Sequence, residues 1–138
     1  MKPLTLHNMK HVKVIVAVLL LIPFIVSCQK VHRFRIAFDA DEVHFEKEGG
    51  SRTLHIVEGT FEQMHVPVIS GSDYPPFEGD GTNYLKRDWI ELRRIVEDET
   101  VSLEITVQEN AIGKARNAQV TVAHMERESM TTVKVYQE

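Results

Sequence analysis

The stretch VHFEKEGGSRTLHIV, residues 43–57, is almost symmetric about its two central glycines. Apolar and polar residues alternate on both sides of them. Glycine readily adopts the positive φ angles that a two-residue hairpin turn requires. We therefore expect an antiparallel hairpin with Gly49-Gly50 as its turn. The expected cross-strand pairs on the apolar face are Phe45 with Leu54 and Val43 with Ile56.

The same register places one histidine opposite another on the polar face. His44 and His55 would lie about 5 Å apart, close enough to supply two metal ligands. A structural zinc site needs four ligands and a catalytic one usually three. The neighbours Glu46 and Thr53 do not stand at a recognisable ligand spacing. The two histidines are more simply polar residues on a solvated face, so we expect neither a metal nor another cofactor.

Alternation of apolar and polar residues with a period of two recurs along the rest of the chain. Short alternating runs are typical of strands that bury one face. Because turn residues separate these runs, the pattern predicts an all-β fold, an antiparallel β-sandwich of about seven strands. The expected strands lie at residues 34–38, 43–45, 54–56, 64–68, 103–107, 118–122 and 133–135.

A second hairpin is expected at the end of the chain. Its strands carry alternating valines on both sides of the stretch MERES, residues 125–129. No glycine lies in this connection, so we expect a longer loop than a two-residue turn. The expected pairs are Val122 with Val133 and Val120 with Val135.

The first part of the chain has the features of an export signal. Three lysines and no acidic residue precede the apolar run VIVAVLLLIPFIV, residues 14–26. This run is shorter than the ~20 residues that cross a bilayer. A basic start followed by a short apolar centre is typical of a secretory signal. The next residues complete the sequence Ile25-Val26-Ser27-Cys28, which resembles the bacterial lipobox and implies cleavage before Cys28 and acylation of that cysteine.

Cys28 is the only cysteine in the chain. A lone cysteine in an exported protein has no disulfide partner, and lipidation would explain its presence. Two or more acyl chains anchor a protein stably in a membrane. The alternatives are a plain secretory signal and an uncleaved short membrane segment. We expect residues 1–27 to be a lipoprotein signal peptide, residues 28–33 a short tether and residues 34–138 one domain.

The expected mature chain is acidic. Removing the three lysines of residues 1–27 from the 16 basic residues of the chain leaves 13, against 20 acidic residues, a formal charge of −7. Such a charge argues against nucleic acid as a partner and against broad adhesion to anionic lipid. With no disulfide available, the stability of the domain must come from its core.

Several short motifs follow one another in the second half of the chain: DWIEL from Asp88, VSLEITVQEN, ARNAQVTV and a final VKVYQE. Their order and spacing resemble the BACON family, the Bacteroidetes-associated carbohydrate-binding often N-terminal domains. The matching positions are Trp89-Ile90, Asn110, Arg116, Ala118, Val120, Val133, Val135 and Gln137. The resemblance covers about residues 34–138 and implies an immunoglobulin-like sandwich in a bacterial envelope. It also implies carbohydrate binding, although we expect the domain to stand alone here, with no enzyme attached.

The segment SGSDYPPFEGDGTNYLK, residues 70–86, is expected to be a long loop, and such loops are often functional. Its aromatic residues Tyr74, Phe77 and Tyr84 could stack on the C–H faces of sugars, while nearby Asp and Asn side chains bind hydroxyls. Alternatively, Phe77 plugs the end of the sandwich. Trp89, just beyond, is expected to be buried.

No nucleophile, metalloprotease or phosphate-binding motif occurs in the sequence. The run VEDET, residues 96–100, is expected to be a solvated turn rather than part of a catalytic carboxylate pair. We therefore expect a non-catalytic binding module that recognises a glycan or a protein. The alternative is a structural subunit of an envelope complex that acts as a scaffold or spacer. An enzyme is the third and least favoured hypothesis. The expected location is the bacterial cell envelope, with a lipid anchor in the outer membrane, on either its periplasmic or its outward side.

Overall fold

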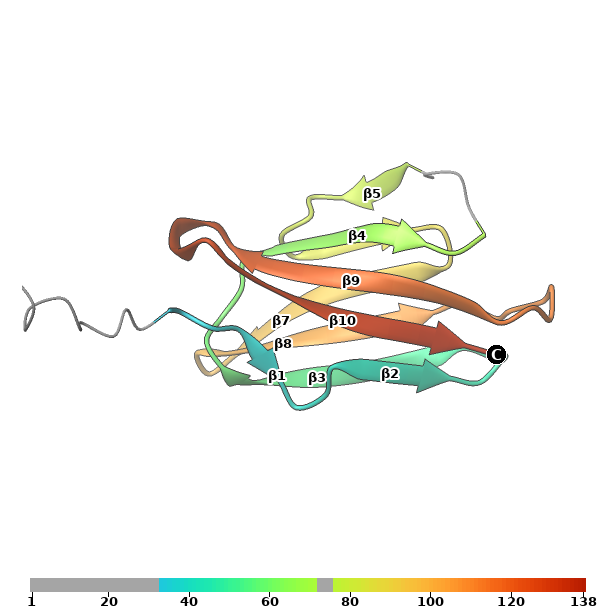
Figure 1. The fold of residues 1–138 in the computed structure, drawn as a ribbon, viewed down its shortest axis with the longest axis horizontal. Coiled ribbons are helices and arrows are strands. Elements are labelled where there is room, and N and C mark those ends of the chain that lie inside the picture. The colour runs from blue at the N-terminus through green and yellow to red at the C-terminus, as the bar shows by residue number, and fades with distance from the viewer. Residues whose placement is uncertain (1–32, 72–75) are drawn as a thin grey trace, which may run out of the picture. The chain divides into compact units, whose positions relative to one another are not determined.

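The computed structural model describes residues 33–71 and 76–138. They belong to one compact unit, Arg33–Glu138, whose strands form two packed sheets (Figure 1). The predicted all-β sandwich is confirmed, with ten described strands where about seven were expected. The strands are β1 (Ala37–Phe38), β2 (Glu42–Phe45), β3 (Gly50–Glu58), β4 (Gln63–Ile69), β5 (Phe77–Gly79), β6 (Tyr84–Arg87), β7 (Ile90–Glu97), β8 (Thr100–Val107), β9 (Arg116–His124) and β10 (Ser129–Gln137).

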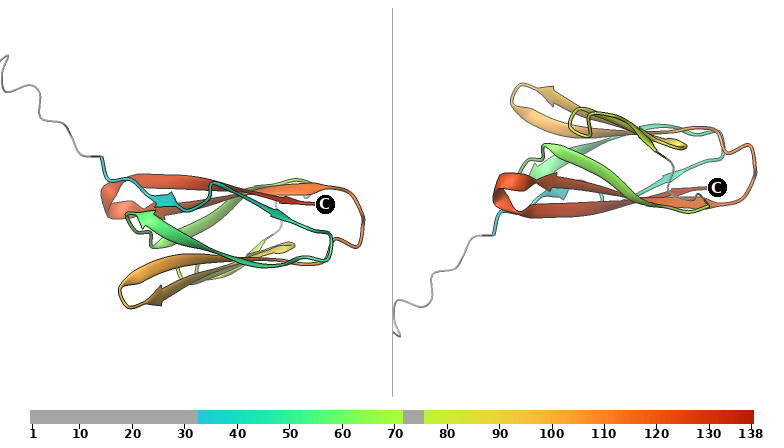
Figure 2. Two further views of the ribbon diagram at one scale, coloured as in Figure 1. Left: turned by 90° about the horizontal axis from the view of Figure 1, so that it is seen from below. Right: turned by 90° about the horizontal axis from the view of Figure 1, so that it is seen from above.

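One sheet has six strands in the order β1-β3-β8-β7-β6-β5, and the other has four in the order β2-β10-β9-β4. The two layers lie face to face in both views of Figure 2. The alternating residues of each strand point into the space between them, and their burial provides most of the favourable free energy of folding. Leu103, Ile105, Val120 and Val122 are among the residues that are fully buried there.

Residues 43–57 do not form the hairpin that their symmetry predicts. β2 lies in the four-stranded sheet and runs parallel to β10, so that Val43 pairs with Val135. β3 lies in the opposite sheet and runs antiparallel to β8, so that Leu54 pairs with Leu103. The expected pairing of Phe45 with Leu54 is therefore wrong, although both side chains are buried in the core as expected.

The two glycines serve a crossing between the sheets instead of a hairpin turn. The N–H of Gly49 donates to the Glu46 carbonyl at 3.0 Å, which closes a turn after β2. Gly49 has a φ of 79°, and a Cβ on it would lie 2.4 Å from the Val107 carbonyl oxygen. This position therefore requires glycine both for its backbone conformation and for the close approach to the end of β8.

The crossing separates the two histidines that the predicted register paired. His44 stacks on the ring of Tyr136, with centroids 4.9 Å apart. His55 lies on the other sheet, where its Nδ1 is 3.2 Å from a carboxylate oxygen of Asp39. Both histidines are exposed, so the expectation of a solvated environment is confirmed while the expected His44–His55 pairing is wrong.

The second predicted hairpin is confirmed, with a different register. Val133 pairs with Val120 and Val135 with Ala118, two residues away from the expected alignment. The connection is the short 3-10 helix η1 (Met125–Arg127) followed by Glu128 at a φ of 47°, so the longer loop is confirmed. A slip of two residues preserves which side chains face the core, because the strand period is two.

Residues 70–86 are not one continuous loop. β5 and β6 form a small antiparallel hairpin in which Phe77 pairs with Arg87 and Gly79 with Leu85. β6 then pairs with β7, a strand that the alternation pattern did not predict. The run VEDET contains the exposed turn between β7 and β8, as expected.

Candidate functional site

A groove of about 410 Å³ lies beside β4, the edge strand of the four-stranded sheet, and β5–β6, the edge hairpin of the other sheet. β4 and β5 lie together at the upper side of Figure 1. Apolar side chains of Met64, Val66 and Leu85 form part of its wall. The remaining lining residues are Gln63, His65, Pro67, Phe77, Asp80, Gly81, Thr82 and Arg87.

Arg87 links the two sheets across this groove. Its Nη1 donates a hydrogen bond of 2.6 Å to the Val66 carbonyl on β4. The regular ladder between β4 and β9 is interrupted between His65 and Val68. Pro67 lies in this interruption and has no N–H to donate. The guanidinium thus contacts the backbone of β4 next to its irregular segment.

Phe77 is the exposed aromatic residue of the groove, with 56% of its surface accessible. Its place follows from the β5–β6 register, which sets it opposite Arg87. Two residues further on, Gly79 has a φ of 109°, and a Cβ there would lie 2.3 Å from the Tyr84 carbonyl oxygen. Glycine at this position therefore lets β5 approach β6 closely. Because Phe77 is more than half exposed, it does not plug the end of the sandwich.

Asp80 holds the turn between β5 and β6 in a fixed shape. Its Oδ1 accepts hydrogen bonds from the backbone N–H groups of Thr82, Asn83 and Tyr84, at 2.8, 2.7 and 3.1 Å. These bonds, with that of Tyr84 first, then Thr82 and Asn83, lower the pKa of Asp80 to about 2. The groove therefore carries a permanent negative charge at this turn at any pH above that value.

The three aromatic residues predicted to bind a sugar, Tyr74, Phe77 and Tyr84, do not all lie at the groove in the part of the chain that the structure describes. Tyr74 lies outside the described residues. Tyr84 does not line the groove; its ring is near Arg93 on β7, with the guanidinium 5.7 Å from the ring centroid. Among the described aromatics of residues 70–86, Phe77 is the one that lines the groove.

His65, Arg87 and Thr82 also line the groove, and the sequence did not single them out as binding residues. They come from β4, β6 and the turn before β6, on two different sheets. Proline within a strand indicates an edge or irregular strand, and Pro67 lies in β4, an edge strand with an irregular ladder. The edge position leaves one side of β4 open, so Pro67 was the one local signal in the sequence for the groove.

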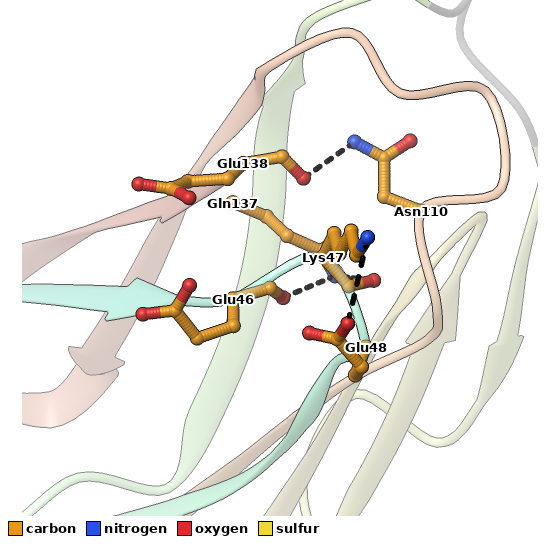
Figure 3. A network of polar contacts seen from close by, with 6 residues as sticks. All are labelled: Glu46, Lys47, Glu48, Asn110, Gln137 and Glu138. Atoms are coloured by element: carbon orange, nitrogen blue, oxygen red, sulfur yellow. Dashed lines mark hydrogen bonds and ion pairs between the residues drawn. The ribbon is translucent and has the colours of Figure 1, made fainter.

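Some of the residues that carry the resemblance lie at another place, the end of the sandwich that contains the C-terminus, where Figure 3 shows Asn110 and Gln137. The side-chain amide of the buried Gln137 donates toward the carbonyls of Gln108 at 2.9 Å and Glu46 at 3.1 Å. Its Oε1 accepts from Arg116 Nε at 2.8 Å. The Nδ2 of Asn110 donates to the Lys114 and Glu138 carbonyls, both at 2.8 Å. We call Gln137, Asn110 and Arg116 the polar cluster.

Trp89 is buried beneath this polar cluster, as expected. The guanidinium of Arg116 lies 4.4 Å from the centroid of its ring, a cation–π contact. Burial lowers the pKa of Arg116, and the carboxylate of Asp88 partly opposes that shift. Since the side-chain amide nitrogens of Asn110 and Gln137 and the Nε and Nη2 of Arg116 already bind backbone carbonyls or one another, the polar cluster stabilises loops.

No three His, Cys, Asp or Glu side chains within residues 33–71 and 76–138 gather closely enough to hold a metal ion. Over the same part of the chain, the structure contains no helix with the length and apolar character needed to span a bilayer. Comparisons with family models, with curated proteins and with solved structures find nothing that matches this chain.

Proposed function

We propose that this protein is a non-catalytic recognition module, anchored in a bacterial envelope, that binds a glycan in the groove beside β4. The observation that carries the proposal is the exposed ring of Phe77 among polar side chains at this groove. A flat aromatic ring can pack on the apolar C–H face of a sugar, and ligand sites are lined by aromatic side chains together with a few polar groups.

The polar lining suits neutral hydroxyl groups. His65 and Gln63 can donate or accept hydrogen bonds, Thr82 offers a hydroxyl, and Asp80 accepts. Sugars carry hydroxyls that both donate and accept, so a mixed set of this kind matches them. The resemblance of residues 34–138 to carbohydrate-binding BACON domains favours the same ligand class.

The anchor belongs to the same proposal. Acylation of Cys28 would tether the domain to a membrane through residues 28–33, and the acidic mature chain would keep it soluble beside that membrane. Cys28 lies outside the described residues, and the support for its role is the lipobox-like sequence before it.

A glycan array with three matched proteins tests the ligand. Phe77→Ala should weaken binding to the bound glycans by about two- to twelvefold, because an aromatic stacking contact is worth about 0.5–1.5 kcal/mol. Tyr84→Ala removes an aromatic residue from the same hairpin but outside the groove, so it should bind like the parent protein. Absence of any glycan signal from the parent, or equal losses in both variants, would reject glycan binding in this groove.

A second candidate is a structural subunit that packs against an envelope protein through a sheet face. The outer face of the four-stranded sheet favours it. Along β9 and β10 the outward residues, given as cross-strand pairs, are Asn117 with Tyr136, Gln119 with Lys134, Thr121 with Thr132 and Ala123 with Met130, and Lys134 alone is charged. Interface cores are depleted in charge. Purification of a stable protein complex that is lost on Gln119→Glu, and that Phe77→Ala leaves intact, would favour this candidate.

A further inference from the structure

Two large apolar side chains are exposed together at one corner of the sandwich, the connection between β9 and β10. Met125 begins the connection and is 58% exposed, and Met130 follows it and is 72% exposed. Neither side chain packs in the core, whereas Met64 does. Both residues belong to the same end of the β9–β10 hairpin, and exposed apolar side chains that cluster in one region mark a contact surface more often than isolated ones do.

The chain enters the domain at this same corner. The ring of Phe34 packs edge-on against His124, with centroids 5.0 Å apart. The guanidinium of Arg127 lies 4.6 Å from the centroid of the Phe34 ring, on the other side of the connection. The first described residues and the β9–β10 connection therefore form one continuous surface, which we call the entry corner (Figure 1).

The length of the tether limits how far this corner can lie from an anchor at Cys28. From Cys28 to Arg33 there are five residue steps, which span about 18 Å at most in any conformation. β9 has nine residues, so the opposite end of the sandwich lies about 30 Å further along its strands. If Cys28 carries the lipid, the entry corner lies within about 18 Å of the anchor, whereas the β8–β9 loop can lie about 30 Å further away.

We propose that the entry corner is a membrane-contacting surface, with Met125 and Met130 entering the polar edge of the bilayer. The proposal rests on the proposed acylation of Cys28. Met side chains suit such a surface because they adapt their shape to irregular apolar surroundings.

Positive and negative side chains are mixed around the entry corner, so its contact with a membrane would depend on the tether rather than on attraction to anionic lipid. Arg33, Arg35 and Arg127 are exposed there, and Glu62, Glu126 and Glu128 lie on the same connection or beside it. The strongly acidic turn at Glu97, Asp98 and Glu99 lies at the same end, but between β7 and β8 of the other sheet. Repulsion of this turn from a negatively charged surface would tilt the domain so that the entry corner approaches first.

Fluorescence quenching by brominated lipid tests the contact on the full acylated protein. Met130→Trp places a tryptophan on the entry corner, and Ile112→Trp places one in the β8–β9 loop, where Ile112 is 78% exposed. Both positions are exposed, so neither change should disturb the fold, and the buried Trp89 gives the same background in each. The proteins are reconstituted in phosphatidylcholine vesicles whose acyl chains carry bromine near the headgroup end.

We expect vesicle flotation of all the proteins, with emission of the Met130→Trp protein strongly quenched and that of the Ile112→Trp protein unchanged. Flotation with no quenching at position 130, or with equal quenching at both positions, would overturn the membrane contact and leave the anchor standing. Failure of the parent protein to float would overturn the anchor and the contact together.

Discussion

The side chain of Gln137 joins the β2–β3 crossing, the β8–β9 loop and the start of β9 through two polar atoms. Gln137→Leu would keep the size of this side chain but remove its hydrogen bonds to Arg116 Nε and to the carbonyls of Glu46 and Gln108. The two carbonyls keep their bonds from the Gly49 N–H and from Arg116 Nη2. Because one hydrogen bond contributes about 0.5–1.5 kcal/mol, we expect the loss of three to lower the free energy of unfolding by about 2 kcal/mol or more.

Urea unfolding followed by the emission of Trp89, the one tryptophan of the chain, measures this loss. Lys134→Leu is the matched control, since it puts the same residue at an exposed position of the same strand and should change stability by no more than about 0.5 kcal/mol. A Gln137→Leu protein as stable as the control would show that the polar cluster does not stabilise the fold.

Asp80 should titrate near pH 2, below the ordinary value of 3.8, because three backbone N–H groups bind its charged form. The folded state therefore holds this proton less tightly than the unfolded state does. Its contribution to stability is complete above about pH 4 and is lost as the pH falls through 4 toward 2. A side-chain carboxyl signal in a magnetic resonance titration reports the midpoint directly, and a midpoint near 4 for Asp80 would contradict the hydrogen bonds.

The sequence patterns predicted the burial or exposure of single side chains better than they predicted strand pairing. Alternation correctly marked Val43, Phe45 and Leu54 as buried and His44 as exposed, since facing inward depends only on a local period of two. The positive φ of Gly49 was predicted as well. The carbonyl of Val107 that crowds this glycine comes from a strand far along the chain, which no local pattern contains.

At the scale of elements, the β7–β8 turn contains two non-glycine residues in the left-handed region, Asp98 at a φ of 47° and Glu99 at 66°. Both central residues of a type I′ hairpin turn need positive φ, and glycine is favoured at the second one. Glu99→Gly should therefore raise the free energy of unfolding by about 0.5–1 kcal/mol. Glu97→Gly, in the strand before the turn, should lower it, and the reverse order in urea unfolding would contradict the turn geometry.

The sequence predicted where strands lie better than it predicted which strands pair with one another. In a two-layer sandwich, both sheets bury one face of each strand, so alternation does not distinguish a neighbour in the same sheet from one in the opposite sheet. This is why residues 43–57 matched a hairpin although β2 and β3 lie in different layers. In the β9–β10 hairpin the loop length decided the register, and the 3-10 turn at Met125–Arg127 shifted it by two residues.

For the whole molecule, the sequence predicted one residue of the lining of the candidate groove, and that it binds a glycan stays a prediction. Phe77 was chosen from its loop-like, aromatic-rich surroundings, and the structure places it in a groove. His65 and Arg87 could not be chosen in the same way, because the groove exists only where the edges of two sheets meet. Tyr84 shares the composition of its segment with Phe77, but strand alternation turns it toward Arg93 instead.

The proposed acylation of Cys28 predicts that membrane association depends on this residue. Cys28→Ser removes the thiol that would carry the lipid, and no second cysteine can replace it. We expect the protein to move from the membrane fraction to the soluble fraction, since stable anchoring needs two or more acyl chains. Fractionation of cells that express the parent and the variant measures this, and a variant that stays with the membranes would contradict lipidation.

The account depends most on recognition at the groove between β4 and β5–β6. The most direct measurement is a magnetic resonance titration of the nitrogen-labelled Cys28→Ser protein with the oligosaccharide that binds best on the array. We predict that the backbone signals of Val66, Phe77 and Arg87 shift together, while those of Asn117 and Tyr136 on the outer face of the four-stranded sheet stay in place. Shifts confined to that outer face, or none at all, would contradict the account.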